Sequence, residues 1–232
     1  MRRDTPESFV LSVDQGLPAG PETVCEVLEP MLTEARRRKI TEVIAARSNS
    51  VLPVLDGLID PHNIAAILRS AEAFGLSEVH LIRSPQPFLA SQRVAQGTQR
   101  WVDVVEHASA AVCVAGLRAR GYRVYVAAMD GDVPPEGLAA LPRVAVVFGN
   151  EHAGVSDELR QLADGAYTIP MRGFVQSLNV SVAAALTIFS AMRDRPGDLT
   201  REQRLLLRAR FCMASVPQAH EIVAEHLRRS QP

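Results

Sequence analysis

The chain has 232 residues, of which 47% are hydrophobic and 22% are charged, and its formal net charge is −1. This length fits one domain with terminal additions or two small domains, and the apolar share excludes a wholly disordered chain. No apolar run reaches the roughly 18 residues of a membrane helix, and the segment from Met1 to Pro6 lacks the apolar core of a signal peptide. We therefore expect a cytoplasmic protein with no membrane partner.

Two segments are basic, although the chain as a whole is almost neutral. Residues 31–50 carry five basic against two acidic side chains, and residues 193–232 carry eight arginines against five acidic side chains. Residues 1–30, by contrast, carry two arginines against six acidic side chains. A basic segment is either a contact surface for a polyanion or a solvated helix face, and charge alone favours the second reading.

The three cysteines, Cys25, Cys113 and Cys212, lie far apart in the sequence and form no CxxC pair. Neither a disulfide framework nor a zinc site has this spacing. We therefore expect reduced thiols and no metal ligands.

The predicted elements begin with a loose extension over residues 1–30, which holds four prolines and two glycines and has room for one short strand at Phe9–Val13. Apolar residues at helical spacing predict a helix over 31–47. From residue 51 strands and helices alternate. The predicted strands are 51–58, 79–82, 102–106, 122–129, 144–148 and 166–170, and the helices between them are 62–74, 108–120 and 156–163. This alternation predicts an α/β fold with a mostly parallel sheet covered by helices on both faces.

The segment 177–192 predicts a helix that is apolar nearly all round. Such a helix is buried, either within the fold or in a subunit interface. Two amphipathic stretches, 200–213 and 217–229, predict helices that close the chain. We therefore divide the chain into an extension (1–30), a central domain (31–195) and a C-terminal helical segment (196–232).

The first group of candidate site residues opens the predicted helix at 62–74. Asp60 can cap this helix, with Pro61 at its first position. Arg69 lies off the apolar face of the helix, and Asn63 lies near its N-terminus, where unpaired backbone N–H groups can receive an anion. A surface arginine and a capping asparagine are the structural alternative.

The second group follows the apolar strand at 144–148, which runs directly into a polar turn, Gly149–Gly154, containing Asn150 and Glu151. Ligands of open α/β sheets bind at the carboxyl ends of the strands, and glycine lets the backbone approach a ligand closely. The turn has neither the ending of a P-loop nor the GxGxxG spacing, so neither nucleotide motif applies. An ordinary strand-to-helix turn is the alternative.

The third group lies where a predicted strand ends at Pro170 and a short loop leads to the apolar helix. Ser177 and Asn179 place polar side chains at the N-terminus of that helix. These groups need partners, from a helix cap or from a ligand, and a purely structural cap needs only one of them.

Together the three groups resemble the SpoU (TrmH) family of RNA ribose 2′-O-methyltransferases, within the SPOUT superfamily. The matching stretches are Asn63–Arg69, Phe148–Gly154 and Ile169–Ala184, the last with Ser-Leu-Asn-Val-Ser at 177–181. The resemblance covers about residues 35–195. It is strongest to the TrmH branch, through residues 60–63, 99–102 and 171–181, whereas residues 1–30 match nothing in the family.

This resemblance implies a C-terminal trefoil knot, S-adenosylmethionine as methyl donor and an obligate homodimer. By motif match, the backbone around five positions is expected to surround the adenosyl group: Ala127, Gly149, Ile169, Met171 and Leu178. Apolar and glycine positions suit an adenine held by main-chain hydrogen bonds. Since the leaving group becomes neutral, the reaction requires no metal.

The resemblance also implies the catalytic residues. Arg69 matches the family arginine that is proposed to remove the proton of the ribose 2′-hydroxyl. Because arginine is normally always charged, we interpret Arg69 either as a strongly perturbed base or, preferably, as a cation that holds the target phosphate and acidifies the hydroxyl. Asn63 and Glu151 are expected to orient Arg69 or the ribose, and Ser177 and Asn179 to shape the pocket.

The substrate implied by the TrmH branch is the guanosine at position 18 in the tRNA D-loop, whereas other SpoU relatives modify ribosomal RNA. We expect phosphate contacts on Arg36, Arg37, Arg38 and Lys39 and on the C-terminal arginines. Two alternatives stay open: a non-catalytic RNA-binding protein of the same fold, and an unrelated nucleotide-dependent α/β enzyme. The presence of all the catalytic positions disfavours the first, and the missing nucleotide motifs disfavour the second.

Overall fold

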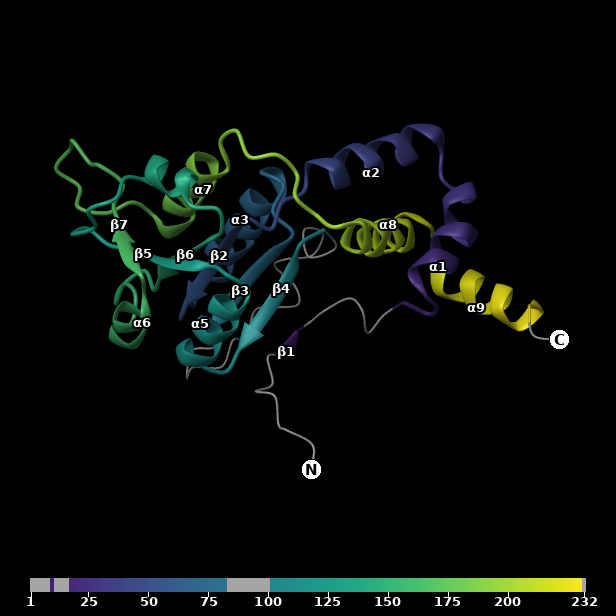
Figure 1. Ribbon diagram of the computed structural model, residues 1–232, viewed down its shortest axis with the longest axis horizontal. Helices are drawn as coiled ribbons and strands as arrows, with labels where there is room; N and C mark the ends of the chain where they lie inside the picture. Colours follow the sequence, from purple (N-terminus) through teal and green to yellow (C-terminus); the bar gives the residue numbers. More distant parts are fainter. Residues whose placement is uncertain (1–8, 11–16, 83–100, 231–232) are drawn as a thin grey trace, which may run out of the picture. The chain divides into compact units, whose positions relative to one another are not determined.

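The computed structural model describes residues 9–10, 17–82 and 101–230 of the chain. These residues form two compact units (Figure 1). One unit comprises strand β1 and residues 49–195, and the other comprises the segments 17–48 and 196–230. The candidate residues of all three sequence groups lie in the first unit.

The first unit is built on a seven-stranded sheet with the order β1-β4-β3-β2-β6-β5-β7. Its strands are β1 (Phe9–Val10), β2 (Val51–Asp56), β3 (Glu78–Ile82), β4 (Asp103–His107), β5 (Arg123–Ala127), β6 (Val144–Gly149) and β7 (Gly165–Tyr167). All pairs are parallel except β1 with β4 at the edge. Strands β2 and β6 pair from Val51 opposite Val144 to Asp56 opposite Gly149, so both central strands end side by side.

Helices cover both faces of this sheet, as predicted. They are α3 (Pro61–Ala73), the 3₁₀ helix η4 (Pro135–Ala140) and α7 (Val180–Met192) on one face, and α5 (Ala110–Ala119) and α6 (Asp157–Leu162) on the other. Side chains of β2 alternate between the two cores: Val51 and Leu55 face α3 and α7, whereas Leu52 and Val54 face α5 and α6. A strand buried on both faces reads as a continuous apolar run, which is why these strands were recognisable from sequence.

The second unit consists of helices. They are α1 (Pro21–Leu28), the 3₁₀ helix η2 (Glu29–Met31), α2 (Glu34–Ala46), α8 (Arg201–Ser215) and α9 (Ala219–Arg229). Helices α1 and α2 both pack against α8, and Val24, Leu28 and Phe211 are buried among them. Residues 31–48, which the sequence analysis grouped with the sheet, thus pack with the C-terminal helices instead.

The structure corrects part of the predicted extension, because residues 21–28 form a helix. Pro21 stands in its first turn, where its missing N–H costs nothing, and Val24, Cys25 and Leu28 are buried. The predicted strand at 9–13 is present at residues 9–10, and residues 11–13 lie outside the described residues, as do Gln99 and Arg100 of the branch motif.

Two boundaries near the candidate site also differ from the prediction. Strand β7 ends at Tyr167, and α7 begins at Val180 because Asn179 caps it. Among the described helices, none has both the length and the apolar character needed to cross a membrane.

Candidate active site

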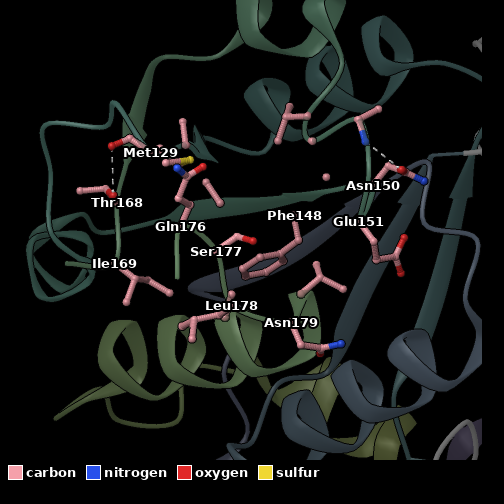
Figure 2. A pocket seen from close by; sticks show the side chains of 18 of the residues that line it. Met129, Phe148, Asn150, Glu151, Thr168, Ile169, Gln176, Ser177, Leu178 and Asn179 are labelled. Carbon is pink, nitrogen blue, oxygen red and sulfur yellow. Dashed lines mark hydrogen bonds between the residues drawn. The ribbon is translucent and has the colours of Figure 1, made fainter. Parts of the chain in front are cut away.

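A pocket of about 620 Å³ lies at the carboxyl ends of β5, β6 and β7 (Figure 2). Phe148 and Tyr167 contribute to its wall, and the loop before α7 closes it with Gln176, Ser177 and Leu178. All five positions expected to surround an adenosyl group line this pocket: Ala127, Gly149, Ile169, Met171 and Leu178. The pocket falls within the range of small-molecule sites, and its position is where parallel sheets bind ligands.

The turn after β6 is held in one shape by Asn150. Its Nδ2 donates to the carbonyl of Gly57 at 2.9 Å, and its Oδ1 accepts from the backbone N–H groups of His152 and Ala153 at 2.9 and 3.1 Å. Asn150 and Gly154 also exchange two backbone hydrogen bonds. Gly154 has φ of +71°, a conformation that glycine adopts without strain. The sequence pattern placed Asn150 in the turn but gave no sign of these three side-chain bonds.

Gly149 is required by the close approach of this turn to its own strand. A Cβ atom at Gly149 would lie 2.1 Å from both Gly154 C and Val155 N. Asp56, at the end of the neighbouring strand, accepts a hydrogen bond of 2.8 Å from the N–H of Ser156 and so fixes the far end of the turn. The backbone at the pocket is thus fixed before any ligand arrives.

Three candidate side chains from all three sequence groups form one hydrogen-bonded row. Asn63 Nδ2 donates to Glu151 Oε1 at 2.8 Å, and Asn179 Nδ2 donates to Asn63 Oδ1 at 3.1 Å. Figure 2 shows Glu151 and Asn179 from the β6 turn and the start of α7 on the same side of the pocket. Asn63 is buried and does not line the pocket, whereas Glu151 and Asn179 do.

Asn179 caps the start of α7, and Ser177 is a second polar residue just before this helix. Asn179 Oδ1 accepts from the N–H of Ser181 at 2.9 Å and from Ser181 Oγ at 2.5 Å, so Asn179 is both a cap and a member of the row. Ser177 is exposed and lines the pocket. Its hydroxyl is available to a ligand.

Arg69 is not part of this group in the described chain. It is exposed on α3, six residues after Asn63, which is about 9 Å along the helix axis at 1.5 Å per residue. It does not line the pocket. The structure therefore brings together Asn63, Glu151, Ser177 and Asn179 and leaves Arg69 outside.

The predicted RNA-contacting residues lie on α2, in the second unit. Arg37, Arg38 and Lys39 are exposed. Arg36 is half-buried, and its Nε donates to Ser215 Oγ at 3.0 Å, so this arginine links α2 to α8. The four basic residues therefore divide into three that face solvent and one that supports the unit.

A second polar cluster lies under α5, on the face of the sheet away from α3 and α7. Arg120 donates to both oxygens of Glu78, and His80 Nε2 lies 3.3 Å from Glu78 Oε2. His80 Nδ1 lies 2.8 Å from His107 Nε2. Because the carboxylate only accepts, His80 donates to Glu78.

The environment of this cluster shifts two pKa values. Burial lowers the pKa of His107 to about 4, with help from the charges of His80 and Arg120. Burial opposes ionisation of Glu78, but hydrogen bonds from His80 and Arg120 outweigh it and lower the pKa of Glu78 to about 2. His107 is thus held neutral in the core, and Cys113 beside it is buried with its pKa raised to about 12.

Comparison with known proteins gives consistent matches over this unit. Residues 50–189 match the SpoU rRNA Methylase family. The chain is 40% identical over 164 residues to a tRNA (guanosine(18)-2′-O)-methyltransferase of Thermus thermophilus, covering 70% of this chain and 84% of that protein. It is 33% identical over 157 residues to the 23S rRNA (guanosine-2′-O-)-methyltransferase RlmB of Xanthomonas campestris, covering 67% and 63%.

Solved structures show the same fold. A TrmH/SpoU tRNA modifying enzyme of A. aeolicus superimposes with a TM-score of 0.69 at 25% identity, covering 80% of this chain and 98% of that one. The SpoU methyltransferase AviRb of Streptomyces viridochromogenes, in complex with the cofactor AdoMet, superimposes with a TM-score of 0.57 at 26% identity, covering 66% and 63%.

Proposed function

Because the chain belongs to the SpoU rRNA methylase family, we propose that it transfers a methyl group from S-adenosylmethionine to a ribose 2′-hydroxyl of RNA, at guanosine 18 of tRNA. The observation that carries this proposal is the pocket, which has all five expected cofactor positions in its lining and the hydrogen-bonded polar row at its edge. The relative from T. thermophilus, which covers most of both chains, favours tRNA as the substrate.

The pocket fits S-adenosylmethionine by size and by lining. Its volume of about 620 Å³ suits a nucleoside with an amino-acid tail, and its wall combines apolar side chains with backbone at Gly149, Ile169 and Met171. AviRb, a relative in fold, has AdoMet bound. When bound, this group supplies an electrophilic methyl carbon on a sulfonium, and the protein has to align the ribose and deal with one poorly acidic proton.

The polar row positions groups around the ribose. Glu151 Oε1 is engaged by Asn63, which leaves Glu151 Oε2 and the Ser177 hydroxyl facing the pocket as contacts for the ribose hydroxyls. Arg69 stands outside the pocket, so its part in the reaction requires that the RNA or a partner subunit complete the site. As a permanent cation it can hold the target phosphate and lower the pKa of the neighbouring hydroxyl.

We further propose a homodimer. Helix α7 leaves Val182, Leu186 and Phe189 exposed, at 47%, 44% and 53%, although it is apolar nearly all round. Positions four and three residues apart lie on one helix face, so these side chains form an apolar stripe that a second copy would cover. Family membership also implies the trefoil knot in the C-terminal part of the first unit.

The alternative substrate is ribosomal RNA, which the relative from X. campestris favours. The test is to incubate the purified chain with labelled S-adenosylmethionine and either a tRNA transcript or a 23S rRNA transcript, and to digest the product to nucleosides. The proposal predicts 2′-O-methylguanosine in the tRNA, lost when guanosine 18 is replaced by another nucleotide. Label only in the 23S rRNA would assign the alternative, and label on a base would reject the chemistry.

A further inference from the structure

The loop between β7 and α7 carries an exposed aromatic ring beside the pocket. Phe174 is fully exposed, and among the described residues it has no ring contact. It lies between Met171 and Gln176, both of which line the pocket, but it does not line the pocket itself. Its ring is therefore outside the pocket wall, on a loop of which both flanking parts line the pocket.

The neighbours of Phe174 give this part of the loop a defined chemical character. Arg172 is exposed and has neither a hydrogen-bond nor an ion-pair partner among the described residues. At Gly173 an added Cβ would meet nothing within 4 Å, so the loop stands away from the rest of the unit here. Val175 is also exposed, at 66%. The loop beside the pocket thus carries an exposed aromatic side chain and an exposed cation two positions apart.

Aromatic side chains interleaved with arginine are the means by which proteins bind unpaired nucleotides: the ring stacks on a base and the cation meets the backbone. A ribose can reach a methyl donor in the pocket only if its nucleotide enters the pocket, and the Met171–Gln176 loop is one of the segments beside which the neighbouring bases would then lie. Stacking on a base would remove the apolar ring of Phe174 from water, which is energetically favourable.

We propose that Phe174 is a stacking platform for an unpaired base of the substrate RNA and that Arg172 contacts the neighbouring phosphate. This inference rests on the proposed function, since it assigns part of the RNA path of the same site. It concerns recognition only: Phe174 takes no part in binding the methyl donor or in the transfer step.

The test compares Phe174→Ala, Phe174→Trp and, as a matched control, Val175→Ala, which removes an exposed aliphatic group from the next position. The dissociation constants for the tRNA transcript at fixed salt and for S-adenosylmethionine are measured, together with the sedimentation coefficient. Phe174→Ala is expected to raise the RNA dissociation constant about 5- to 100-fold, the range of one stacked base. Phe174→Trp and Val175→Ala should stay within about threefold of wild type.

A second readout follows the ring directly. The wild-type chain has one tryptophan, Trp101, so the indole introduced by Phe174→Trp adds a separate fluorescence signal. We expect a short unpaired RNA to quench the added signal, as stacking requires.

Three results would overturn the proposal while leaving the methyl transfer of the wild type untouched. An unchanged RNA dissociation constant in Phe174→Ala means that no base stacks on the ring. A matching rise in the S-adenosylmethionine dissociation constant places the ring in the cofactor site, and a shift to a smaller sedimenting species makes it a subunit contact. Failure of the wild-type chain to methylate any RNA would instead reject the proposed function.

Discussion

The side-chain amide of Asn63 donates a 2.8 Å hydrogen bond to Glu151, 88 residues further along the chain. This bond joins the first turn of α3 to the turn after β6, and Asn179 extends it to the start of α7 at 3.1 Å. Because Asn63 is buried, the loss of either bond would leave a polar atom of Asn63 without a partner. The bond therefore fixes the position of Glu151 relative to the pocket wall.

Replacement of this bridging amide tests its positioning role. Asn63→Ala should lower kcat for methyl transfer about 10- to 100-fold, because Glu151 loses the partner that orients it, and should cost about 1–2 kcal/mol of stability. Asn63→Asp, which keeps the shape but sets a carboxylate against Glu151, should be at least as damaging. Both are measured by single-turnover kinetics and urea unfolding. Wild-type kcat in Asn63→Ala would show that the row is structural only.

The close approach of the turn to Gly149 can be tested by comparing an alanine substitution at Gly149 with one at Gly173. Gly149→Ala places a methyl group 2.1 Å from backbone atoms of Gly154 and Val155, so we expect a loss of about 3 kcal/mol in unfolding free energy and weaker binding of S-adenosylmethionine. Gly173→Ala, in the exposed loop beside the pocket, meets nothing within 4 Å and should leave both unchanged. Equal behaviour of the two variants in calorimetry would contradict the tight turn.

The lowered pKa of His107 predicts acid sensitivity. The folded pKa of His107, about 4, lies below its ordinary value of 6.5, so the unfolded chain takes up the proton first and stability falls as the pH drops from 6.5 to 4. The loss should amount to about 1–3 kcal/mol. Glu78, with a pKa of about 2 against 4.5, adds a second loss as the pH falls from 4.5 to 2.

His107→Gln separates these two effects. Glutamine can still form a hydrogen bond with His80 but does not titrate, so urea unfolding should show a flatter pH dependence between pH 6.5 and 4 and an unaltered decline below it. The same slope as wild type between pH 6.5 and 4 would mean that another group is responsible.

The exposed stripe of α7 predicts self-association. Leu186→Arg puts a charge in the middle of the stripe and should convert dimers into monomers in sedimentation at micromolar concentration. Met31→Arg, at another exposed apolar side chain in the helical unit, is the control and should remain dimeric. A monomeric wild type, or dimers in both variants, would refute an interface on α7.

Local sequence signals located most of the elements around the site. Asp60 and Pro61 predicted the start of α3, and the Asp60 side chain accepts a hydrogen bond from the N–H of His62 at 2.9 Å. The apolar run of β6 followed by Gly149 predicted both the central strand and the turn at its end. These features were readable because each depends on residues within one or two turns of chain.

Contacts between residues far apart in the chain could not be predicted from such local signals. The sequence predicts a loose segment at 21–28, whereas the structure has a helix there, because the stability of this helix comes from packing on α8, about 180 residues away in the chain. The bond between Asn63 and Glu151 likewise has no local signal, since either side chain could as well have faced solvent. The sequence pattern identified Arg69 as an arginine of the expected type at the expected position. It could not predict how far Arg69 lies from the pocket, because that depends on which way its helix face points and on RNA or a second subunit.

The central claim is that this pocket methylates a ribose of RNA with Arg69 as an essential cation. The most direct test is to map 2′-O-methyl groups on total RNA of the source organism after deletion of the gene and after complementation with wild type or Arg69→Ala. We predict that one tRNA guanosine mark disappears on deletion, returns with wild type and stays absent with a normally folded Arg69→Ala protein. A mark that persists in the deletion strain, or that returns in full with Arg69→Ala, would contradict the account.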